Sequence, residues 1–185
     1  AFIISTEKRD EILANCKTEE ERKKTAELIR PILRGRDIKR FSYEWANLWL
    51  VYIPWHFPLH LDNSIQGCSV KAEKEFQKQY PAVYNHLLGY KEQLSARNKA
   101  ETGIRYEWYA LQRWGANYWD DFNQPKLVWT PVNSDYKFTI LPSNFIVNNA
   151  LFMIVGDYVN LLCGFFNSYL FQYYMYLLIS KGSYA

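Results

Sequence analysis

An aromatic run between positions 106 and 137 constrains this chain more than any other feature. Four of its seven tryptophans lie there, namely Trp108, Trp114, Trp119 and Trp129. Polar and basic side chains flank or alternate with them: Arg105, Gln112, Arg113, Lys126 and Lys137. A core has no need of such side chains between its rings. A surface that reads nucleic acid uses both, since rings stack or wedge while Arg and Gln offer paired hydrogen bonds to base edges. The run therefore predicts recognition rather than catalysis.

Length and composition set wider limits. A chain of 185 residues is one domain, or one domain with a helical appendage, and can bury a core. The net charge of +3 by itself indicates little about partners. Basic residues are nevertheless dense at one place: Arg30, Arg34, Arg36, Lys39 and Arg40. Three widely spaced cysteines favour a reduced, cytoplasmic setting over a disulfide framework. The chain lacks an initial Met and a signal-peptide pattern, so we expect it to be part of a longer protein.

The pattern of local signals predicts an α+β fold, with a mixed, mostly antiparallel sheet, flanking helices and a C-terminal helix pair. Helices are expected over 19–29, 70–79 and 81–97, from a Thr18–Glu21 capping pattern, apolar periodicity and Pro81 at a helix start. Strands are expected over 32–33, 48–53, 126–132, 136–141 and 145–155, with a turn at 133–135.

No charged residue occurs from Tyr158 to Ser180, which is long enough to span a bilayer. Asn167 and Gln172 interrupt this segment, and such side chains are costly at bilayer depth. We therefore expect no membrane span. Two helices over 157–166 and 168–179, buried against a soluble core, are favoured instead.

Signals of catalysis are weak. Glu21-Arg22-Lys23 matches part of a metal-dependent nuclease site, but no Pro-Asp partner exists in the chain. His56 and His60 have a spacing that suits zinc on a helix, yet Pro54 and Pro58 argue against a helix there, so ordinary histidines are favoured. A phosphate-binding loop, a nucleophile elbow and an Asn-Pro-Pro-Tyr motif are absent from the sequence. We expect no catalytic residue, metal ligand or cofactor in this chain.

Signals of binding are stronger. Gly35 would allow a tight turn, and Arg34 and Arg36 would clamp a phosphate or a guanine, with Asp37 orienting one of them. Equally open is a surface turn in which an arginine pairs with a structural carboxylate. In the aromatic run, we expect Trp108 and Leu111 to be buried at helical spacing, and Gln112 and Arg113 to face outward. Asn148-Asn149 is either a tight turn, which is favoured, or a contact to a ligand.

Five segments carry a resemblance to a known family. They are Ile-Arg-Pro-Ile-Leu-Arg-Gly-Arg-Asp-Ile-Lys-Arg-Phe (29–41), Tyr-Pro-Ala-Val-Tyr-Asn-His-Leu (80–87), Tyr-Glu-Trp-Tyr-Ala-Leu-Gln-Arg (106–113), Phe-Asn-Gln-Pro-Lys-Leu-Val-Trp (122–129) and Phe-Asn-Ser-Tyr-Leu (166–170). In this order they resemble the TaqI-like C-terminal specificity domain. That domain occurs in adenine-N6 DNA methyltransferases and in fused type IIG restriction-modification enzymes. Residues 114–116 depart from the family pattern.

The resemblance implies a target recognition domain that reads double-stranded DNA and is not itself an enzyme. Residues 1–30 would be a helical linker from the methyltransferase domain of the same polypeptide, 31–157 the recognition domain, and 158–185 helices that pack on it or extend from it. The parent would be a cytoplasmic, bacterial or archaeal, site-specific DNA adenine methyltransferase. S-adenosylmethionine would be its cofactor, with Mg²⁺ where an endonuclease is fused.

Under this interpretation, basic side chains hold phosphates and polar ones discriminate bases. The expected DNA-facing residues are Arg34, Arg36, Lys39, Arg40, Gln112, Arg113, Lys126 and Lys137. One alternative is a protein-interaction or scaffolding domain with exposed aromatics, favoured if Arg34 and Arg36 are locked in internal salt bridges. Another is a stand-alone nuclease that uses Glu21 and Lys23.

Overall fold

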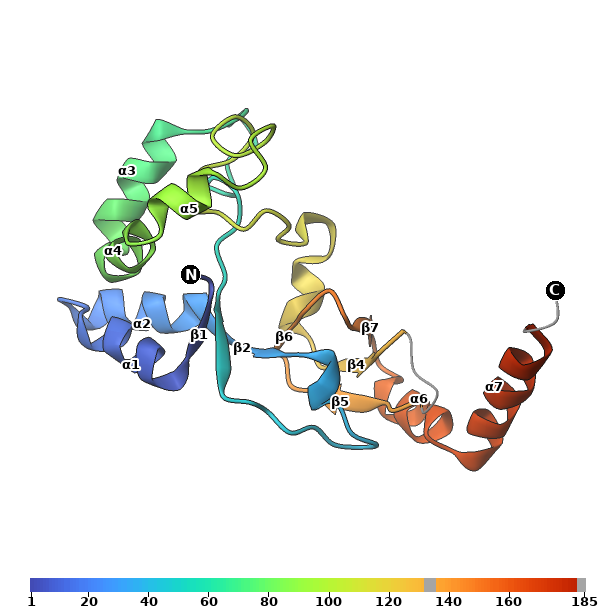
Figure 1. Cartoon of the computed structure of the whole chain (residues 1–185). Helices are drawn as coiled ribbons and strands as arrows, with labels where there is room; N and C mark the ends of the chain where they lie inside the picture. The colour runs from blue at the N-terminus through green and yellow to red at the C-terminus, as the bar shows by residue number, and fades with distance from the viewer. Residues whose placement is uncertain (132–135, 183–185) are drawn as a thin grey trace. The chain divides into compact units, whose positions relative to one another are not determined.

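The chain forms two compact units, each built from two stretches of sequence. Ala1–Arg30 and Asn47–Trp119 make up the first unit, and Pro31–Ala46 and Asp120–Ala185 the second. The computed structural model in Figure 1 describes residues 1–131 and 136–182. Together the units form an α+β fold, as predicted. The expected functional division at residues 30 and 157 stays a prediction, because compactness does not assign function.

Helices predominate in the first unit. Three of them begin at a side-chain cap, because Ser5, Thr18 and Ser69 each accept a hydrogen bond from the backbone N–H three residues further on. The elements are β1 (Ile3–Ser5), α1 (Thr6–Ala14), α2 (Glu19–Leu28), β3 (Leu48–Val51), α3 (Val70–Gln79), α4 (Pro81–Leu88) and α5 (Lys91–Ser95). β1 and β3 pair antiparallel. The helices predicted over 19–29 and 70–79 are confirmed, whereas the one over 81–97 is divided at Gly89 and Tyr90.

Glu21 is buried and works as a structural cap. Its Oε2 accepts from the backbone N–H of Lys17 at 2.9 Å, and its Oε1 from that of Ala82 at 3.2 Å. The carboxylate therefore joins the start of α2 to the start of α4. These contacts, with 7% of Glu21 exposed, argue against the nuclease alternative, in which this carboxylate would hold a metal.

The aromatic run is irregular rather than helical, which corrects the prediction from the Trp108–Leu111 spacing. Trp108 is buried and Leu111 is half-buried. Tyr106 and Tyr109 have no exposed surface, and the Tyr109 ring lies 4.6 Å from that of Phe76. The rings between 106 and 110 thus belong to the core of the first unit.

A buried carboxylate holds this run to the preceding loop. Glu107 has no exposed surface. It accepts hydrogen bonds from the backbone N–H of His56 at 2.8 Å and of Ser69 at 2.9 Å, and it contacts His56 Nδ1 at 3.0 Å. On the other side, Arg97 Nη2 donates to the carbonyls of Trp108 at 2.8 Å and Ala110 at 3.0 Å. His56 is therefore a structural partner of Glu107.

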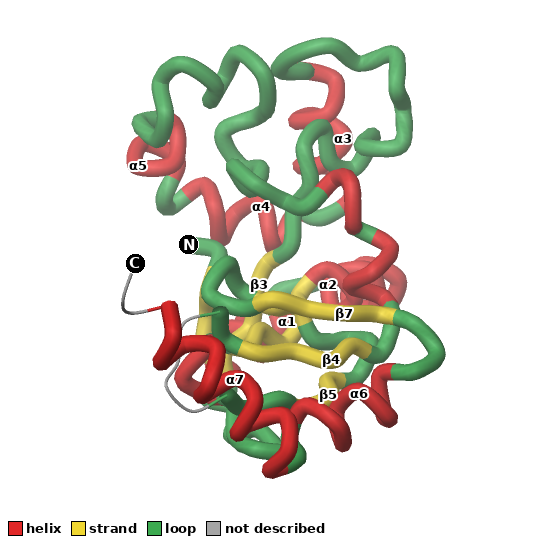
Figure 2. The backbone as a smooth tube through the Cα atoms, turned by 90° about the vertical axis from the view of Figure 1, so that its right-hand side faces the viewer, coloured by secondary structure: helices red, strands yellow, loops and turns green. Residues whose placement is uncertain are grey.

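The second unit is organised around strand β4 (Lys126–Trp129), which pairs antiparallel with β5 (Thr139–Leu141) and β7 (Phe152–Val155). Figure 2 shows these strands side by side. Strand β2 (Ile29–Leu33) runs from the first unit into the second, where it pairs in parallel with β6 (Ile146–Val147). The strand expected over 32–33 is thus longer than predicted, the other expected strands are shorter, and the one expected over 145–155 is divided into β6 and β7. The predicted turn at 133–135 lies outside the described residues. Asn148 forms the favoured turn, since its Oδ1 accepts from the N–H of Ala150.

Helix α6 (Val159–Phe166) packs against this sheet, and α7 (Tyr169–Gly182) follows it. Asn167, between them, has no exposed surface. Its Nδ2 donates to the carbonyls of Phe138 at 2.8 Å and Cys163 at 2.9 Å, and its Oδ1 accepts from the Phe138 N–H at 3.2 Å. The amide thereby fixes the junction of the two helices next to the start of β5.

The prediction of a buried helix pair is correct for one helix alone. Val159 and Cys163 of α6 are buried, but within 169–178 every side chain of α7 is half-buried or exposed. Among the described residues, no helix is long and apolar enough to cross a membrane. An apolar helix at the surface is therefore a feature that the sequence interpretation did not foresee.

Replacing Asn167 by alanine should lower the free energy of unfolding by about 2–4 kcal/mol, because the buried Phe138 N–H loses its partner and the carbonyls of Phe138 and Cys163 each lose one of their hydrogen bonds. Asn160→Ala is the matched control, since Asn160 is exposed on α6, and its effect should stay within about 0.5 kcal/mol. Urea unfolding followed by circular dichroism measures both. Equal stability of the two variants would contradict the role given to Asn167.

Stability should also fall in mild acid. Burial lowers the pKa of His60 below the ordinary value of 6.5, and a hydrogen bond to Pro58 opposes this shift more weakly. The unfolded chain thus binds a proton at His60 at a pH where the folded chain does not. The free energy of unfolding should decrease between about pH 7 and pH 5.5. His60→Gln should make this slope shallower, which urea titrations across that range would detect.

Candidate nucleic-acid interface

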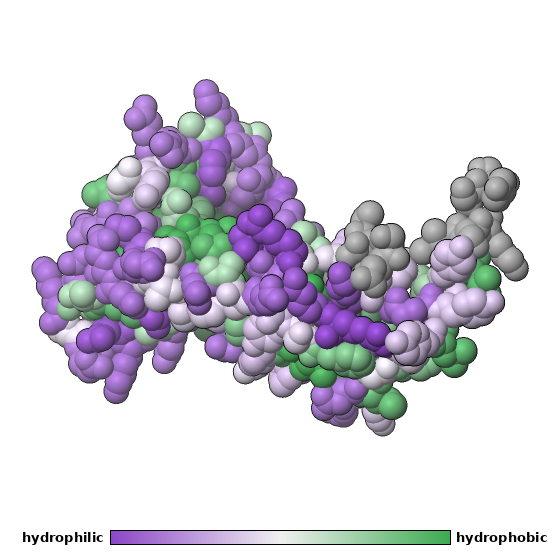
Figure 3. All heavy atoms as spheres, turned by 60° about the horizontal axis from the view of Figure 1, so that its bottom comes forward, coloured by the Kyte–Doolittle hydropathy of each residue, from purple (hydrophilic) through white to green (hydrophobic). Residues whose placement is uncertain are grey.

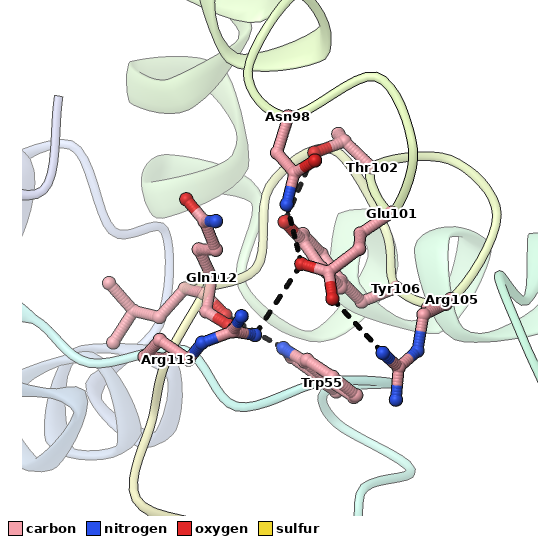
Figure 4. Close-up of polar contacts among 9 residues, drawn as sticks. Trp55, Asn98, Glu101, Thr102, Arg105, Tyr106, Gln112 and Arg113 are labelled. Carbon is pink, nitrogen blue, oxygen red and sulfur yellow. Dashed lines mark hydrogen bonds and ion pairs between the residues drawn. The ribbon is translucent and has the colours of Figure 1, made fainter.

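Arg105 and Arg113 converge on one carboxylate at the surface of the first unit (Figure 4). Arg105 Nη1 donates to Glu101 Oε1 at 3.0 Å, and Arg113 Nη1 to Glu101 Oε2 at 3.4 Å. Asn98 Nδ2 donates to the same Oε2 at 2.6 Å. The Glu101 side chain is 13% exposed, compared with 59% for Arg105 and 71% for Arg113. A largely buried acid therefore orients two exposed guanidinium groups, which we call the arginine pair.

Local backbone structure places Glu101 and Arg105 on one face. The Arg105 N–H donates to the Glu101 carbonyl at 2.7 Å, so these residues stand one helical turn apart. Gly103 lies between them at a φ of 77°, which glycine adopts without strain. Its N–H donates to the Tyr106 carbonyl at 2.8 Å. The chain then enters the buried aromatic run.

A ring also orients Arg105. Its guanidinium carbon lies 5.4 Å from the centre of the Trp55 ring, a cation–π contact. Trp55 in turn stacks on Tyr106, with ring centres 4.8 Å apart, and its Nε1 donates to the Leu111 carbonyl at 2.8 Å. Arg105 is thus fixed by a carboxylate and by an aromatic ring whose own position is determined by the core.

Gln112 stands beside Arg113. It is half-buried, and its carbonyl accepts from Arg113 Nη1 at 3.4 Å. Figure 4 shows its side-chain amide turned away from Glu101. The preceding residue, Leu111, is tied to Ile53 through a backbone hydrogen bond of 2.9 Å. Gln112 and Arg113 therefore project from a braced segment, as predicted for residues that face outward.

The chemistry of this cluster suits an anion or a base edge. A guanidinium has five N–H donors, and each arginine uses few of them on Glu101. Two cations and one anion leave a local excess of positive charge. Arginine matches phosphate oxygens or guanine O6 and N7, and a glutamine amide matches adenine N6 and N7.

In the second unit, Arg34 is committed to an internal ion pair. Its Nε and Nη2 donate to Asp37 Oδ2 and Oδ1 at 3.0 and 2.8 Å. Burial alone would raise the pKa of Asp37, but the hydrogen bonds from Arg34 outweigh it and the pKa is lowered. The alternative of a structural turn is therefore confirmed for Arg34. Arg36 is exposed beside it.

The other basic residues of this turn also have partners. Lys39 pairs with Glu44 at 3.3 Å. Arg40 donates to the Asn167 carbonyl, and its guanidinium carbon lies 5.2 Å from the centre of the Tyr169 ring. Arg40 therefore braces the junction of α6 and α7. Of the residues predicted between 34 and 40, Arg36 offers its guanidinium most freely.

The prediction that Lys126 faces DNA is wrong. It lies in β4 with no exposed surface, and its Nζ donates to the carbonyls of Pro142 at 3.2 Å and Phe145 at 3.1 Å. Alternation along the strand turns Lys126 and Val128 to one face and Leu127 to the other. A buried ammonium cannot contact DNA. Lys137 is half-buried and has interactions within the chain.

The eight predicted residues thus divide between the units. Gln112 and Arg113 belong to the first, and the other six to the second. Arg105 and Glu101 were missed as site residues, although their spacing of four is typical of an ion pair. The contact between Glu101 and Arg113, twelve residues apart, has no such signal in the sequence.

Groups suited to metal or nucleophilic chemistry are not gathered in the part of the chain that the structure describes. There, no three His, Cys, Asp or Glu side chains come close enough to hold a metal ion. Burial raises the pKa of Cys16, Cys68 and Cys163, which disfavours the reactive thiolate.

Comparison with known proteins gives distant likenesses among solved structures alone. No family model and no curated protein matches the chain. Among solved structures, the type IIL restriction-modification enzyme MmeI in complex with DNA aligns with a TM-score of 0.44 and 13% identity. The alignment covers 84% of this chain and 17% of that one, so this chain spans less than a fifth of its length. A likeness of this size does not establish a shared function.

Proposed function

We propose that this chain is a recognition module for double-stranded DNA, non-catalytic by itself, and that the arginine pair and Gln112 form its contact surface. The observation that carries the proposal is the pair itself, in which a largely buried Glu101 holds Arg105 and Arg113 outward. Groups that are oriented before binding lose less freedom on binding. The arrangement therefore favours a specific anionic partner over diffuse attraction.

The burial of the rings between positions 106 and 110 favours a duplex over a single strand as the partner of the arginine pair. Proteins that bind single strands stack bases on exposed aromatic side chains. In this chain Tyr106, Trp108 and Tyr109 are buried, and Arg105 lies over the Trp55 ring. What the surface offers are hydrogen-bond donors and an amide, which are the groups that read base edges in a groove.

The resemblance of the five sequence segments supports a wider proposal. The module would serve a bacterial or archaeal restriction-modification system, as the target-reading part of a site-specific adenine methyltransferase. S-adenosylmethionine, and Mg²⁺ in a fused nuclease, would bind to other domains of that polypeptide. Incubating the parent protein with labelled S-adenosylmethionine and DNA tests this step separately from binding.

Arg113→Ala and Arg105→Ala should each weaken duplex binding by about 1–3 kcal/mol, or roughly 5- to 150-fold in Kd. Fluorescence anisotropy with a labelled duplex, repeated at rising salt, measures the loss. Wild-type binding should itself weaken steeply with salt. Arg22→Ala is the matched control, because Arg22 is exposed on α2 and the change in charge is the same.

Two outcomes would contradict the proposal. One is that the wild-type chain fails to bind duplex DNA at low salt. The other is that Arg22→Ala weakens binding as much as the two site variants, which would indicate attraction by total charge alone.

Gln112→Ala tests base reading apart from phosphate binding. Selection from a pool of random duplexes with the wild-type chain should enrich duplexes that share a preferred sequence. The variant should relax that preference at one position, at a cost of about 1–3 kcal/mol against the preferred base, and keep the salt dependence. If the enriched sequence is unchanged, Gln112 has no part in reading it.

A second candidate function is protein interaction. Two observations favour it: Arg34 is locked on Asp37, and apolar side chains are exposed along α6 and α7. This alternative was favoured if both Arg34 and Arg36 were locked in internal salt bridges. Arg36, however, is exposed, so the condition is met for Arg34 alone. The apolar surface lies on helices of the second unit, whereas the arginine pair lies in irregular backbone of the first unit, so both functions are compatible.

A further inference from the structure

Helix α7 carries two apolar stripes on its exposed surface. One consists of Tyr169, Tyr173 and Tyr176, which are 83%, 63% and 69% exposed. The other consists of Leu170, Tyr174 and Leu178, which are 72%, 57% and 48% exposed. Spacings of three and four residues place each set along one side of the helix. We call these six residues the tyrosine–leucine face, and Figure 3 shows this end of the chain in pale and green tones.

The face is held in place from behind. Phe171 packs with ring centres 4.8 Å from Phe166 and 5.8 Å from Phe138. Gln172 Nε2 donates to the carbonyls of Tyr136 at 3.0 Å and Phe166 at 2.9 Å. These contacts fix the start of α7 on the second unit, so the stripes point away from that unit's core.

The exposed apolar surface is large enough for a stable interface. With roughly 150–250 Å² for a whole aromatic side chain, the tyrosine–leucine face has on the order of 700 Å² accessible. The tyrosine–leucine face alone therefore approaches the ~800 Å² that one partner contributes to a standard interface. Monomers rarely expose such a surface.

The absence of charge indicates the occupant. No Asp, Glu, Lys or Arg occurs between 158 and 180. In a two-fold interface each group meets the same surface, so a charged patch repels itself, whereas a neutral one is complementary to its own copy. DNA and anionic lipid would both require several basic side chains; this segment has none of its own, and Arg40, whose guanidinium carbon lies 5.2 Å from the centre of the Tyr169 ring, is a single cation that also donates to the Asn167 carbonyl. We propose that the tyrosine–leucine face is an interface between two copies of this chain.

Tyrosine suits this role. Its ring is apolar and its hydroxyl remains able to bind water, so a tyrosine-rich face stays soluble in the monomer and packs in the dimer. The hydroxyls would form hydrogen bonds at the rim, where interfaces are polar. The interface is independent of the arginine pair, which belongs to the first unit.

Charge reversal between copies provides the test. The 185-residue chain has a mass of 22.1 kDa and should sediment at about twice that mass when its concentration is raised to about 100 μM. At that concentration, a dimer with a micromolar Kd is almost fully formed. A variant with Leu170→Lys and Tyr174→Lys should be monomeric, and so should one with Leu170→Glu and Tyr174→Glu. An equimolar mixture of the two should recover the dimer mass, because opposite charges then meet across the interface.

The matched control replaces exposed apolar residues elsewhere. Leu61 and Leu88 of the first unit are 82% and 44% exposed, and Leu61→Lys with Leu88→Lys should leave the dimer intact. A monomeric wild-type chain would overturn the proposal, whether or not it binds phosphatidylcholine–phosphatidylserine vesicles. A dimer that persists in both α7 variants would overturn it as well. So would a mixture that stays monomeric while circular dichroism shows both variants folded.

Discussion

The conformation of the aromatic run depends on one buried carboxylate. Glu107 has no exposed surface and is surrounded by hydrogen-bond donors from His56 and Ser69. A buried charge is tolerated when its partners are present and is strongly destabilising when one is lost. Because the run continues into Gln112 and Arg113, the outward direction of these side chains follows from how Glu107 is satisfied. A core interaction thus determines the geometry of the candidate binding surface.

Local patterns predicted the elements whose stability is local. Helix α2 begins at the Thr18 cap, as the capping pattern indicated, because the cap and its N–H partner lie three residues apart. The aromatic run was wrongly expected to be helical, since its ring spacing fits a helix while its backbone is bound by Arg97 and Ile53. Partners so distant in sequence leave no local signal. The same holds for Asn167, whose partner Phe138 directly precedes β5.

The candidate site was predicted in part, for a similar reason. The sequence alone does not show whether a basic side chain faces solvent or donates to a carbonyl group inside the protein. Lys126 was expected at the surface, but it donates to two backbone carbonyls of the segment that follows β5. Only the folded chain brings these carbonyls to Lys126. Arg34 was left open, correctly, because Asp37 lies within its turn. The sequence did mark Gln112 and Arg113, and the spacing of Glu101 and Arg105 would have completed the cluster.

The division of the chain has a consequence for how it is made. Residues 31–46 belong with residues that follow position 119, and residues 1–30 belong with 47–119. Each unit therefore needs contacts of high sequence separation, which form late because the loop between them must close first. During synthesis, β2 emerges long before β6, the strand it pairs with, and its unpaired edge is exposed meanwhile. The second unit can become complete only after residues beyond position 119 have left the ribosome, and no single cut in the sequence separates the two units.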